Sequence, residues 1–220
     1  MQKLSTDFYE RDDVAQIAKD LLGKYIITTF NQQTTVGRIV ETEAYAGIID
    51  KASHAYNNRR TARTEVMFGP AGFSYVYLCY GIHHLFNVVC NVKDKPDAVL
   101  IRGIEPVEGI NTMLNRFNKE KPDSSIGRGP GNVSKALGIS TQHTGLQLQS
   151  NKMTIDQVEP MALAKGMSAA EFAKLKARLG GGADGTKAKQ PTEVQPTEDY
   201  NRKQEPIENK KVKDTLNSLV

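Results

Sequence analysis

The sequence predicts an α+β fold, in which a single domain is built on a curved, mainly antiparallel β-sheet with surrounding helices. Three observations lead to this prediction. Several runs rich in aromatic and β-branched residues follow one another and are separated by turn signals, as in an antiparallel sheet. Amphipathic helical stretches lie before and after these runs. From residue 180 onward large apolar residues almost vanish, so we predict a disordered polar tail over 180–220.

The first part of the chain predicts one helix and a β-hairpin. Apolar residues recur at helical spacing over Asp12–Leu22, and Gly23 can end that helix. Tyr25–Phe30 and Thr35–Tyr45 have the composition of strands. The turn signal Asn31–Thr34 separates them, so the two strands are predicted to pair as a hairpin.

The middle of the chain predicts three more strands and then a helix. A long polar loop, Ala46–Thr64, precedes a turn at Gly69–Gly72. The strands are expected at Phe73–Cys79, Leu85–Asn91 and Ala98–Ile104. Pro106 suits the first position of a helix. The apolar face of that helix would contain Val107, Ile110, Leu114 and Phe117.

The last third of the chain predicts two helices and one strand. A glycine-rich loop, Gly127–Gly131, precedes a short helix at Val133–Leu137, and a strand is expected at Leu146–Ile155. A capping box that begins at Ser168 predicts a helix that runs to Leu179. The predicted organisation is therefore a main domain over 1–158, a separate helix over 159–179 and the polar tail over 180–220.

Composition limits the class of protein. The chain has 220 residues and a net charge of +4, which permits nucleic-acid binding without requiring it. Cys79 and Cys90 have neither metal-ligand spacing nor a histidine partner set, so we expect no metal site. The start of the chain is polar and no apolar run reaches 18 residues, so we expect an intracellular protein without a membrane span. The sequence has no P-loop, HExxH or nucleophile-elbow motif.

The strand that ends at Tyr45 carries two carboxylates on one face. Because side chains alternate along a strand, Ile39, Glu41, Glu43 and Tyr45 lie on the same side. A carboxylate beside apolar and aromatic groups can act as a general base. The alternative is an edge strand whose glutamates are exposed to solvent and take no part in chemistry.

Aromatic and polar residues mark the three middle strands. Tyr75 and Tyr77 share a strand face, and Tyr80 lies at the strand end beside a glycine. Flat side chains of this kind stack on nucleobases, and a tyrosine at a tip can enter a groove as a wedge; an aromatic core is the alternative. Asn87 and Arg102 interrupt apolar strands, which indicates either a polar pocket or structural hydrogen bonds.

The long polar loop ends in a cluster of basic residues. His54 is followed by Arg59, Arg60 and Arg63. These arginines could hold nucleic-acid phosphates. A solvated charged loop is the alternative interpretation.

Taken in order along the chain, these segments resemble the alkyladenine (3-methyladenine) DNA glycosylase family. The resemblance runs from about Phe8 to Ile155, and the ordered set of motifs is far more specific than any one of its parts. The motifs are Gly37–Tyr45, Ser53-His54, Met67-Phe68, Tyr75–Tyr77, Tyr80-Gly81, Asn87, Leu100–Pro106, Gly129-Pro130 and Lys135–Leu137.

The resemblance implies a monofunctional enzyme that flips an alkylated or deaminated purine out of duplex DNA and hydrolyses its N-glycosidic bond. Glu43 would deprotonate the attacking water, while His54 and Arg102 would help to hold the water and the nucleotide. Tyr45, His54 and Tyr77 would sandwich the base. Asn87 would crowd the 2-amino group of normal guanine, and Tyr80 would be the wedge. Phosphate contacts are expected from Arg59, Arg60, Arg63 and Lys135.

The same resemblance implies a monomer that acts on duplex DNA in a bacterial cytoplasm or nucleoid, without a cofactor or metal. No lysine is placed for Schiff-base chemistry, so we expect hydrolysis without strand cleavage. Family members usually end with a further strand-forming segment, which Glu159–Val220 does not contain. A non-catalytic lesion-binding protein with the same fold is therefore one alternative, and a small-molecule α+β enzyme whose tyrosines are all core residues is another.

Overall fold

The structure, a computed structural model, describes residues 1–157. The helix predicted over 159–179 and the tail predicted over 180–220 lie outside the described residues. Within residues 1–157, no helix combines the length and the apolar character needed to cross a bilayer.

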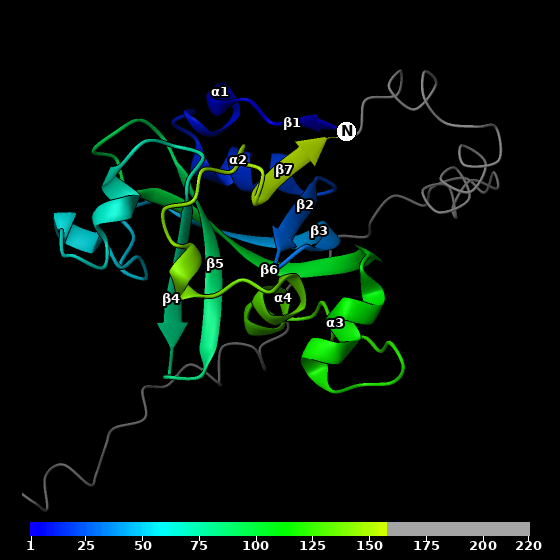
Figure 1. The fold of residues 1–220 in the computed structure, drawn as a ribbon. Helices are drawn as coiled ribbons and strands as arrows, with labels where there is room; N and C mark the ends of the chain where they lie inside the picture. The colour runs from blue at the N-terminus through cyan, green and yellow to red at the C-terminus, as the bar shows by residue number, and fades with distance from the viewer. Residues whose placement is uncertain (158–220) are drawn as a thin grey trace, which may run out of the picture. The chain divides into compact units, whose positions relative to one another are not determined.

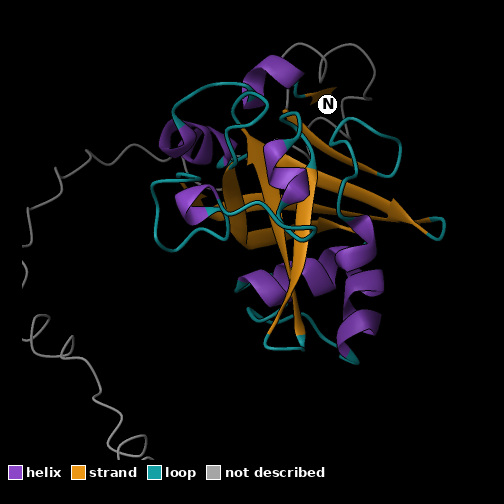
Figure 2. Ribbon diagram, turned by 90° about the vertical axis from the view of Figure 1, so that its left-hand side faces the viewer, coloured by secondary structure: helices purple, strands orange, loops and turns teal. Residues whose placement is uncertain are grey.

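Within the described residues, a seven-stranded sheet forms the centre of the fold (Figure 1). Its strand order is β1-β7-β2-β3-β6-β5-β4, and every neighbouring pair is antiparallel. The strands are β1 (Gln2–Lys3), β2 (Tyr25–Phe30), β3 (Gln33–Tyr45), β4 (Ser74–Cys79), β5 (His83–Cys90), β6 (Asp97–Glu108) and β7 (Met153–Gln157). The sheet is curled, as Figure 2 shows from the side. The predicted curved antiparallel sheet with surrounding helices is confirmed.

Short helices flank the sheet at two places. The helices are α1 (Thr6–Tyr9), α2 (Val14–Leu21), α3 (Ile110–Phe117) and α4 (Pro130–Leu137). Helix α2 packs on β3 and β6, and α4 packs on β5 and β6 with α3 beside it; in Figure 1, α1 and α2 lie at the top of the molecule and α3 and α4 at the bottom. Three 3₁₀ helices add to them: η1 (Tyr56–Asn58), η2 (Glu65–Phe68) and η3 (Thr141–His143).

The hydrophobic core has a large part and a small part. The large cluster joins α2 to the sheet and includes the fully buried Ile17, Phe86 and Ile101. The small cluster includes Met67, Phe68 and Tyr75 and lies where the polar loop meets β4 and β5. Each large apolar side chain that is fully buried stabilises the fold by about 1.5–3 kcal/mol. The small cluster therefore fixes the polar loop against the sheet.

Two predicted elements are confirmed with sharper boundaries. Helix α2 begins at Val14 because the Asp13 carboxylate accepts a hydrogen bond from the Gln16 backbone N–H at 2.8 Å, which caps the helix. The β2–β3 hairpin turns through only two residues, Asn31 and Gln32, whose φ values are 51° and 62°. A tight turn of this kind matches the twist of the strands, so β3 starts earlier than predicted.

The predicted start of the helix at Pro106 is wrong, although the helix itself is present as α3. Strand β6 continues through Pro106, which lies opposite Gly37 next to a register shift in the β3–β6 pairing. Proline has no backbone N–H to donate to a neighbouring strand. In a sheet it is therefore tolerated at irregular positions of this kind, where a donor is not needed. Helix α3 begins only at Ile110, after Gly109 with a φ of 72°. Val107, placed on the predicted helix face, is a strand residue.

The strand predicted at Leu146–Ile155 is also wrong in most of its length. Only Met153–Gln157 forms β7, between β1 and β2. Gln147 and Gln149 make isolated bridges instead, to Phe73 and Thr154. Neither β1 nor α1 was predicted, because elements this short have no detectable periodicity.

Candidate active site

A small cavity opens where the end of β3, the polar loop and β4–β5 meet. Its volume is about 30 Å³, which accommodates only one or two water molecules. Its lining residues are Tyr45, Ala52, Ser53, His54, Met67, Tyr75, Tyr77, Asn87 and Ala98. The structure therefore brings together, around one cavity, all four residues that the resemblance assigns to base binding.

Glu43 lies one hydrogen bond away from this cavity. The Tyr45 hydroxyl donates to Oε1 of Glu43 at 2.9 Å, as the alternation of side chains along β3 predicts. Arg102 on β6 donates from Nη1 to Oε2 of Glu43 at 2.5 Å. The Glu43 side chain is 39% exposed, so the carboxylate is held from two sides and is still accessible to water.

The pairing of β3 with β6 places Arg102 beside the two glutamates. Ile39 lies opposite Ile104 and Glu41 opposite Gly103, but Thr42 lies opposite Ile101. Arg102 thus has no residue directly across from it, as in a β-bulge, an irregularity that redirects side chains near active sites. Its guanidinium reaches both Glu43 and Glu41, the latter through Nε at 2.9 Å.

His54 is fixed by partners on either side of its ring. Nδ1 lies 2.8 Å from the Tyr75 hydroxyl, and Nε2 lies 3.3 Å from Nη2 of Arg63. The His54 ring packs edge-to-face on Tyr77, with centroids 4.6 Å apart. Burial, and after it the positive charges of Arg63 and Arg59, lower the pKa of His54. The imidazole is therefore neutral at pH 7.

The tyrosines form an uncharged aromatic wall. The Tyr75 and Tyr77 rings lie 5.6 Å apart and are tilted by 31°. Burial raises the pKa of each of them, and burial together with the hydrogen bond to Glu43 raises the pKa of Tyr45. All three are neutral phenols at pH 7, which suits stacking against a flat ring.

Asn87 is buried in β5 and its amide is anchored. Nδ2 donates to the Tyr75 carbonyl at 3.1 Å and to the Leu85 carbonyl at 3.4 Å. The intruding amide noted in the sequence therefore has backbone partners, as a buried polar group requires. These bonds prevent Asn87 from rotating away from the cavity that it lines.

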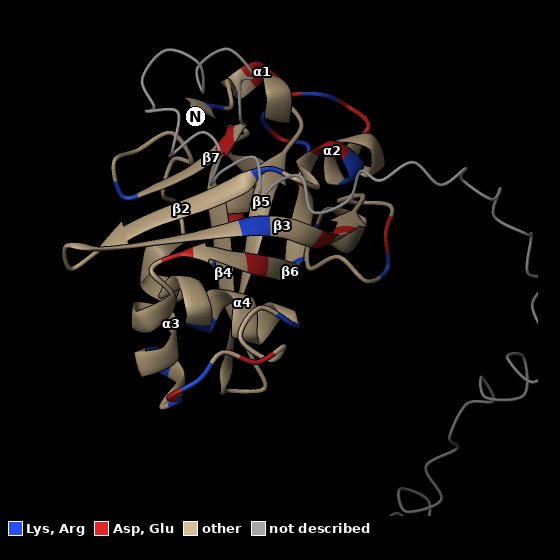
Figure 3. Ribbon diagram, turned by 90° about the vertical axis from the view of Figure 1, so that its right-hand side faces the viewer, with Lys and Arg blue, Asp and Glu red and all other residues tan. Residues whose placement is uncertain are grey.

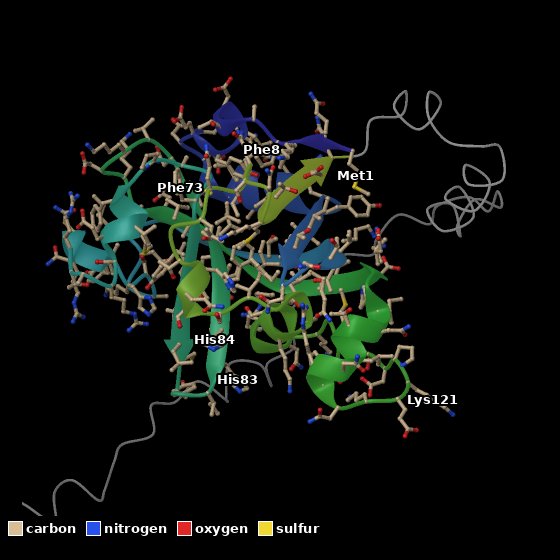
Figure 4. All side chains as sticks on the ribbon, viewed as in Figure 1. Met1, Phe8, Phe73, His83, His84 and Lys121 are labelled. Atoms are coloured by element: carbon tan, nitrogen blue, oxygen red, sulfur yellow. The ribbon has the colours of Figure 1, made fainter. Side chains whose placement is uncertain are left out.

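The β4–β5 hairpin projects from the sheet and carries Tyr80 at its turn. Figure 4 labels His83 and His84, which mark the start of β5 at this end of the hairpin. Tyr80 is 93% exposed and has a φ of 50°. Leu78 and Ile82, close to it in the same hairpin, are also exposed, and a group of exposed apolar side chains often marks an interaction site.

The four residues assigned to phosphate contacts are placed differently from one another. Arg59 is exposed, whereas Arg60 forms ion pairs with Glu65 and Asp94. Arg63 lies with its guanidinium carbon 5.1 Å from the centre of the Tyr77 ring. Lys135, in the last turn of α4, lies with its ammonium 4.7 Å from the centre of the Phe117 ring.

Sequence reasoning did not foresee the contacts that three residues make at this site, although it had expected a phosphate contact from Arg63. Tyr75 holds His54, Arg63 contacts both His54 and Tyr77, and Glu41 shares Arg102 with Glu43. Tyr75 and Glu41 each lie two positions before an assigned residue on the same strand face, which was the available signal. The contacts of Arg63 depend on the loop conformation and had no signal.

Comparison with known proteins shows the family to which the chain is similar. The family model described as methylpurine-DNA glycosylase matches residues 7–179 of the chain. The match covers every residue of the site described above.

Several bacterial proteins are similar over most of their own length, and each is named "Putative 3-methyladenine DNA glycosylase". That of Natranaerobius thermophilus is 46% identical over 151 residues, 68% of this chain and 76% of the relative. That of Clostridium novyi is 40% identical over 186 residues, 79% of this chain and 92% of the relative. That of Chlamydia felis is 44% identical over 155 residues, 70% of this chain and 80% of the relative.

Proposed function

The chain belongs to the methylpurine-DNA glycosylase family and is a 3-methyladenine DNA glycosylase of base excision repair, and we propose that it flips one damaged purine out of duplex DNA and hydrolyses the bond to the sugar with Glu43 as general base. The observation that carries the proposal is the hydrogen bond from Tyr45, which lines the cavity, to the Glu43 carboxylate at 2.9 Å. This bond places a proton acceptor at the edge of an aromatic slot.

Glu43 takes the proton of the attacking water. As the water oxygen bonds to the anomeric carbon, the electron pair of the carbon–nitrogen bond leaves with the purine. Arg102 and Tyr45, which donate to the two oxygens of Glu43, keep both oxygens in fixed positions. His54 helps to hold the flipped nucleotide beside them.

Tyr45, His54 and Tyr77 hold the extruded purine between flat, neutral faces. A purine alkylated on a ring nitrogen is cationic, so it stacks well on electron-rich rings, and it leaves as a neutral base without needing an acid. Because the cavity has a volume of only about 30 Å³, the slot must open before a purine can enter. Deaminated or ethenylated purines such as hypoxanthine and 1,N6-ethenoadenine are proposed as further, slower substrates.

Asn87 gives selectivity against normal guanine. Its amide is held by the Tyr75 and Leu85 carbonyls, so it cannot turn aside for the 2-amino group that adenine, hypoxanthine and their alkylated forms lack. Damaged bases also pair weakly, so the cost of flipping, a few kcal/mol, is least for them.

The hairpin and the basic residues supply the contacts with duplex DNA. Tyr80, fully exposed at its turn, fills the gap that the flipped nucleotide leaves. Arg59 and Lys135 contact phosphates, whereas the ion pairs of Arg60 with Glu65 and Asp94 favour a structural part for that residue. Binding should therefore weaken as the salt concentration rises.

Three further properties belong to the proposal. The enzyme hydrolyses the bond without cutting the strand, because its nucleophile is a water and not an amine. It acts as a monomer, since one lesion occupies one cavity. Its place is the bacterial cytoplasm or nucleoid, where its DNA substrate lies.

The decisive experiment compares the unmutated chain with Glu43→Gln on duplexes that each contain one modified purine. Excision should fall by about 10²- to 10⁴-fold, the order expected for loss of a catalytic proton acceptor, while affinity for the lesion-containing duplex stays within about twofold. Release of the base by Glu43→Gln at the unmutated rate would refute Glu43 as the base. No excision by the unmutated chain, with binding intact, would make the protein a lesion-binding relative.

A further inference from the structure

Glu41 and Glu43 share one cation. Arg102 donates from Nε to Oε1 of Glu41 at 2.9 Å and from Nη1 to Oε2 of Glu43 at 2.5 Å. A guanidinium can give one carboxylate two parallel hydrogen bonds, but here each carboxylate receives one. The three side chains together carry a net charge of −1, since two carboxylates face a single guanidinium.

The fold makes room for Glu41 in this position. A side chain at Gly103, directly opposite Glu41, would place its Cβ 3.0 Å from Cβ of Glu41 and 3.4 Å from Oε2 of Glu41. The absence of a side chain at position 103 therefore lets Glu41 lie across β6 and reach Arg102. The skipped register position of Arg102 completes the arrangement.

We propose that Glu41 is a positioning residue, which turns the Arg102 guanidinium away from a two-bond contact with Glu43 and so keeps Glu43 basic enough to take a proton from water. The proposal rests on the proposed function, in which Glu43 is the general base. A carboxylate that is bound by two guanidinium hydrogen bonds and faces no second anion is stabilised in its charged form. Such a carboxylate is a weaker proton acceptor.

The other charged and titratable groups around Glu43 do not supply this effect. Tyr45 on β3 and Tyr77 on β4 are neutral phenols whose pKa values are raised by burial, and Arg102 on β6 is the cation itself. Among the described residues that bond to Arg102, Glu41 is the second anion.

The size of the effect is limited by exposure. The Glu41 side chain is 54% exposed, and exposed charge pairs contribute about 0.2–1 kcal/mol. The expected change is therefore a small displacement of the pH profile. The same exposure means that substitution of Glu41 leaves the core packing untouched.

A matched control lies on the same pair of strands. Glu105 pairs with Arg38 across β3 and β6, and its side chain is 53% exposed. In Figure 3, these two strands carry neighbouring blue and red bands away from the end of β3. Glu105→Gln removes one negative charge of equal exposure without changing a partner of Arg102.

The test is the pH dependence of single-turnover excision of hypoxanthine from a duplex between pH 5 and 8, for the unmutated chain, Glu41→Gln, Glu105→Gln and Glu43→Gln. We expect the acid limb of the Glu41→Gln profile to move to lower pH, with a plateau rate lowered by up to about fivefold, while Glu105→Gln follows the unmutated profile. A Glu41→Gln profile that overlays the unmutated one, or that shifts no more than that of Glu105→Gln, overturns the proposal. Retained excision by Glu43→Gln would instead refute the proposed function. Because Glu43→Gln is measured as a separate variant, this outcome is distinguishable from a failure of the Glu41 proposal.

Discussion

Arg63 holds His54 in one neutral form. Nη2 of Arg63 lies 3.3 Å from Nε2 of His54, and a guanidinium only donates hydrogen bonds. Nε2 is therefore the acceptor, so the neutral ring carries its proton on Nδ1 and donates it to the Tyr75 hydroxyl at 2.8 Å. The ring edge that faces Arg63 thus has a lone pair in place of a proton.

Arg63→Gln should raise the pKa of His54 toward its ordinary value. Burial is the largest cause of the lowered pKa and stays in place, but the charge of Arg63, the next cause, is removed. The measurement is an NMR titration of the histidine ring protons, with the His54 signal identified from its absence in His54→Gln. Arg59→Gln should raise the pKa less, because Arg59 is the smaller cause. An unchanged or lower pKa in Arg63→Gln would contradict the assigned contact.

The same shift fixes how stability depends on pH. Since the pKa of His54 is lower in the folded protein, the unfolded chain binds a proton first as the pH falls below about 6.5. His54 thus makes the free energy of unfolding decrease between pH 7 and pH 5. Urea unfolding across this range should reveal a smaller decrease in Arg63→Gln and in His54→Gln than in the unmutated chain.

Gly127 and Gly129 lie in one loop, but glycine is required at the two positions for different reasons. A Cβ at Gly127 would lie 1.9 Å from the Ile104 carbonyl oxygen on β6, so Gly127→Ala must displace backbone and should lower the free energy of unfolding by about 3 kcal/mol. Gly129 has a φ of 88° and a ψ of 146° and open space around it. Gly129→Ala should cost the strain of a backbone conformation that is almost exclusive to glycine, about 1–3 kcal/mol, without displacing β6. A smaller loss in urea unfolding for Gly127→Ala than for Gly129→Ala would show that close packing on β6 is not what requires glycine at 127.

The sequence predicted which face of a strand each side chain occupies better than it predicted which residues pair across neighbouring strands. Period-two alternation placed Glu41, Glu43 and Tyr45 on one face of β3, and the structure agrees. The contact of Glu43 with Arg102 needs the skipped register position in β6. A register shift depends on how strands pair in the folded protein, so no local residue pattern predicts it.

Proline and glycine predicted the ends of helices and strands less reliably than period-two alternation predicted the faces of strands. Pro106 has the same fixed φ at the start of a helix and at an irregular strand position, so its local preference could not separate the two. The stretch 146–152 has strand-like composition but only isolated bridges, and a short apolar run does not by itself show whether it will join a continuous ladder. Arg63 looked like its neighbours in sequence, and only the folded loop distinguishes its place over Tyr77.

Asn87→Ala should relax the rejection of normal guanine. Removal of the anchored amide leaves space for the 2-amino group, so release of guanine relative to hypoxanthine should rise about tenfold, the effect of about 1.4 kcal/mol. The Tyr75 and Leu85 carbonyls lose their donor, so the free energy of unfolding should fall by about 1–3 kcal/mol.

A second buried asparagine separates selectivity from stability in that experiment. Asn91 is 5% exposed, against 3% for Asn87, and donates to Asp97 at 2.8 Å without lining the cavity. Asn91→Ala should therefore lower stability with no change in the guanine to hypoxanthine ratio. A parallel rise of the ratio in both variants would mean that loosening of the sheet, and not space beside the base, controls selectivity.

Tyr80→Ala should impair excision from duplex DNA while leaving the fold intact. Tyr80 is 93% exposed, so its loss should change the free energy of unfolding by less than about 0.5 kcal/mol. Flipping costs a few kcal/mol, and a side chain that fills the vacated space offsets part of this cost, so single-turnover excision from a duplex should fall about tenfold or more. Excision of the same base from a single strand, where no gap forms, should be unchanged. Ile82→Ala, which alters a 71% exposed side chain near the same turn, controls for general damage to the hairpin. An equal loss on duplex and single strand would place Tyr80 in base binding or chemistry instead of in the duplex gap.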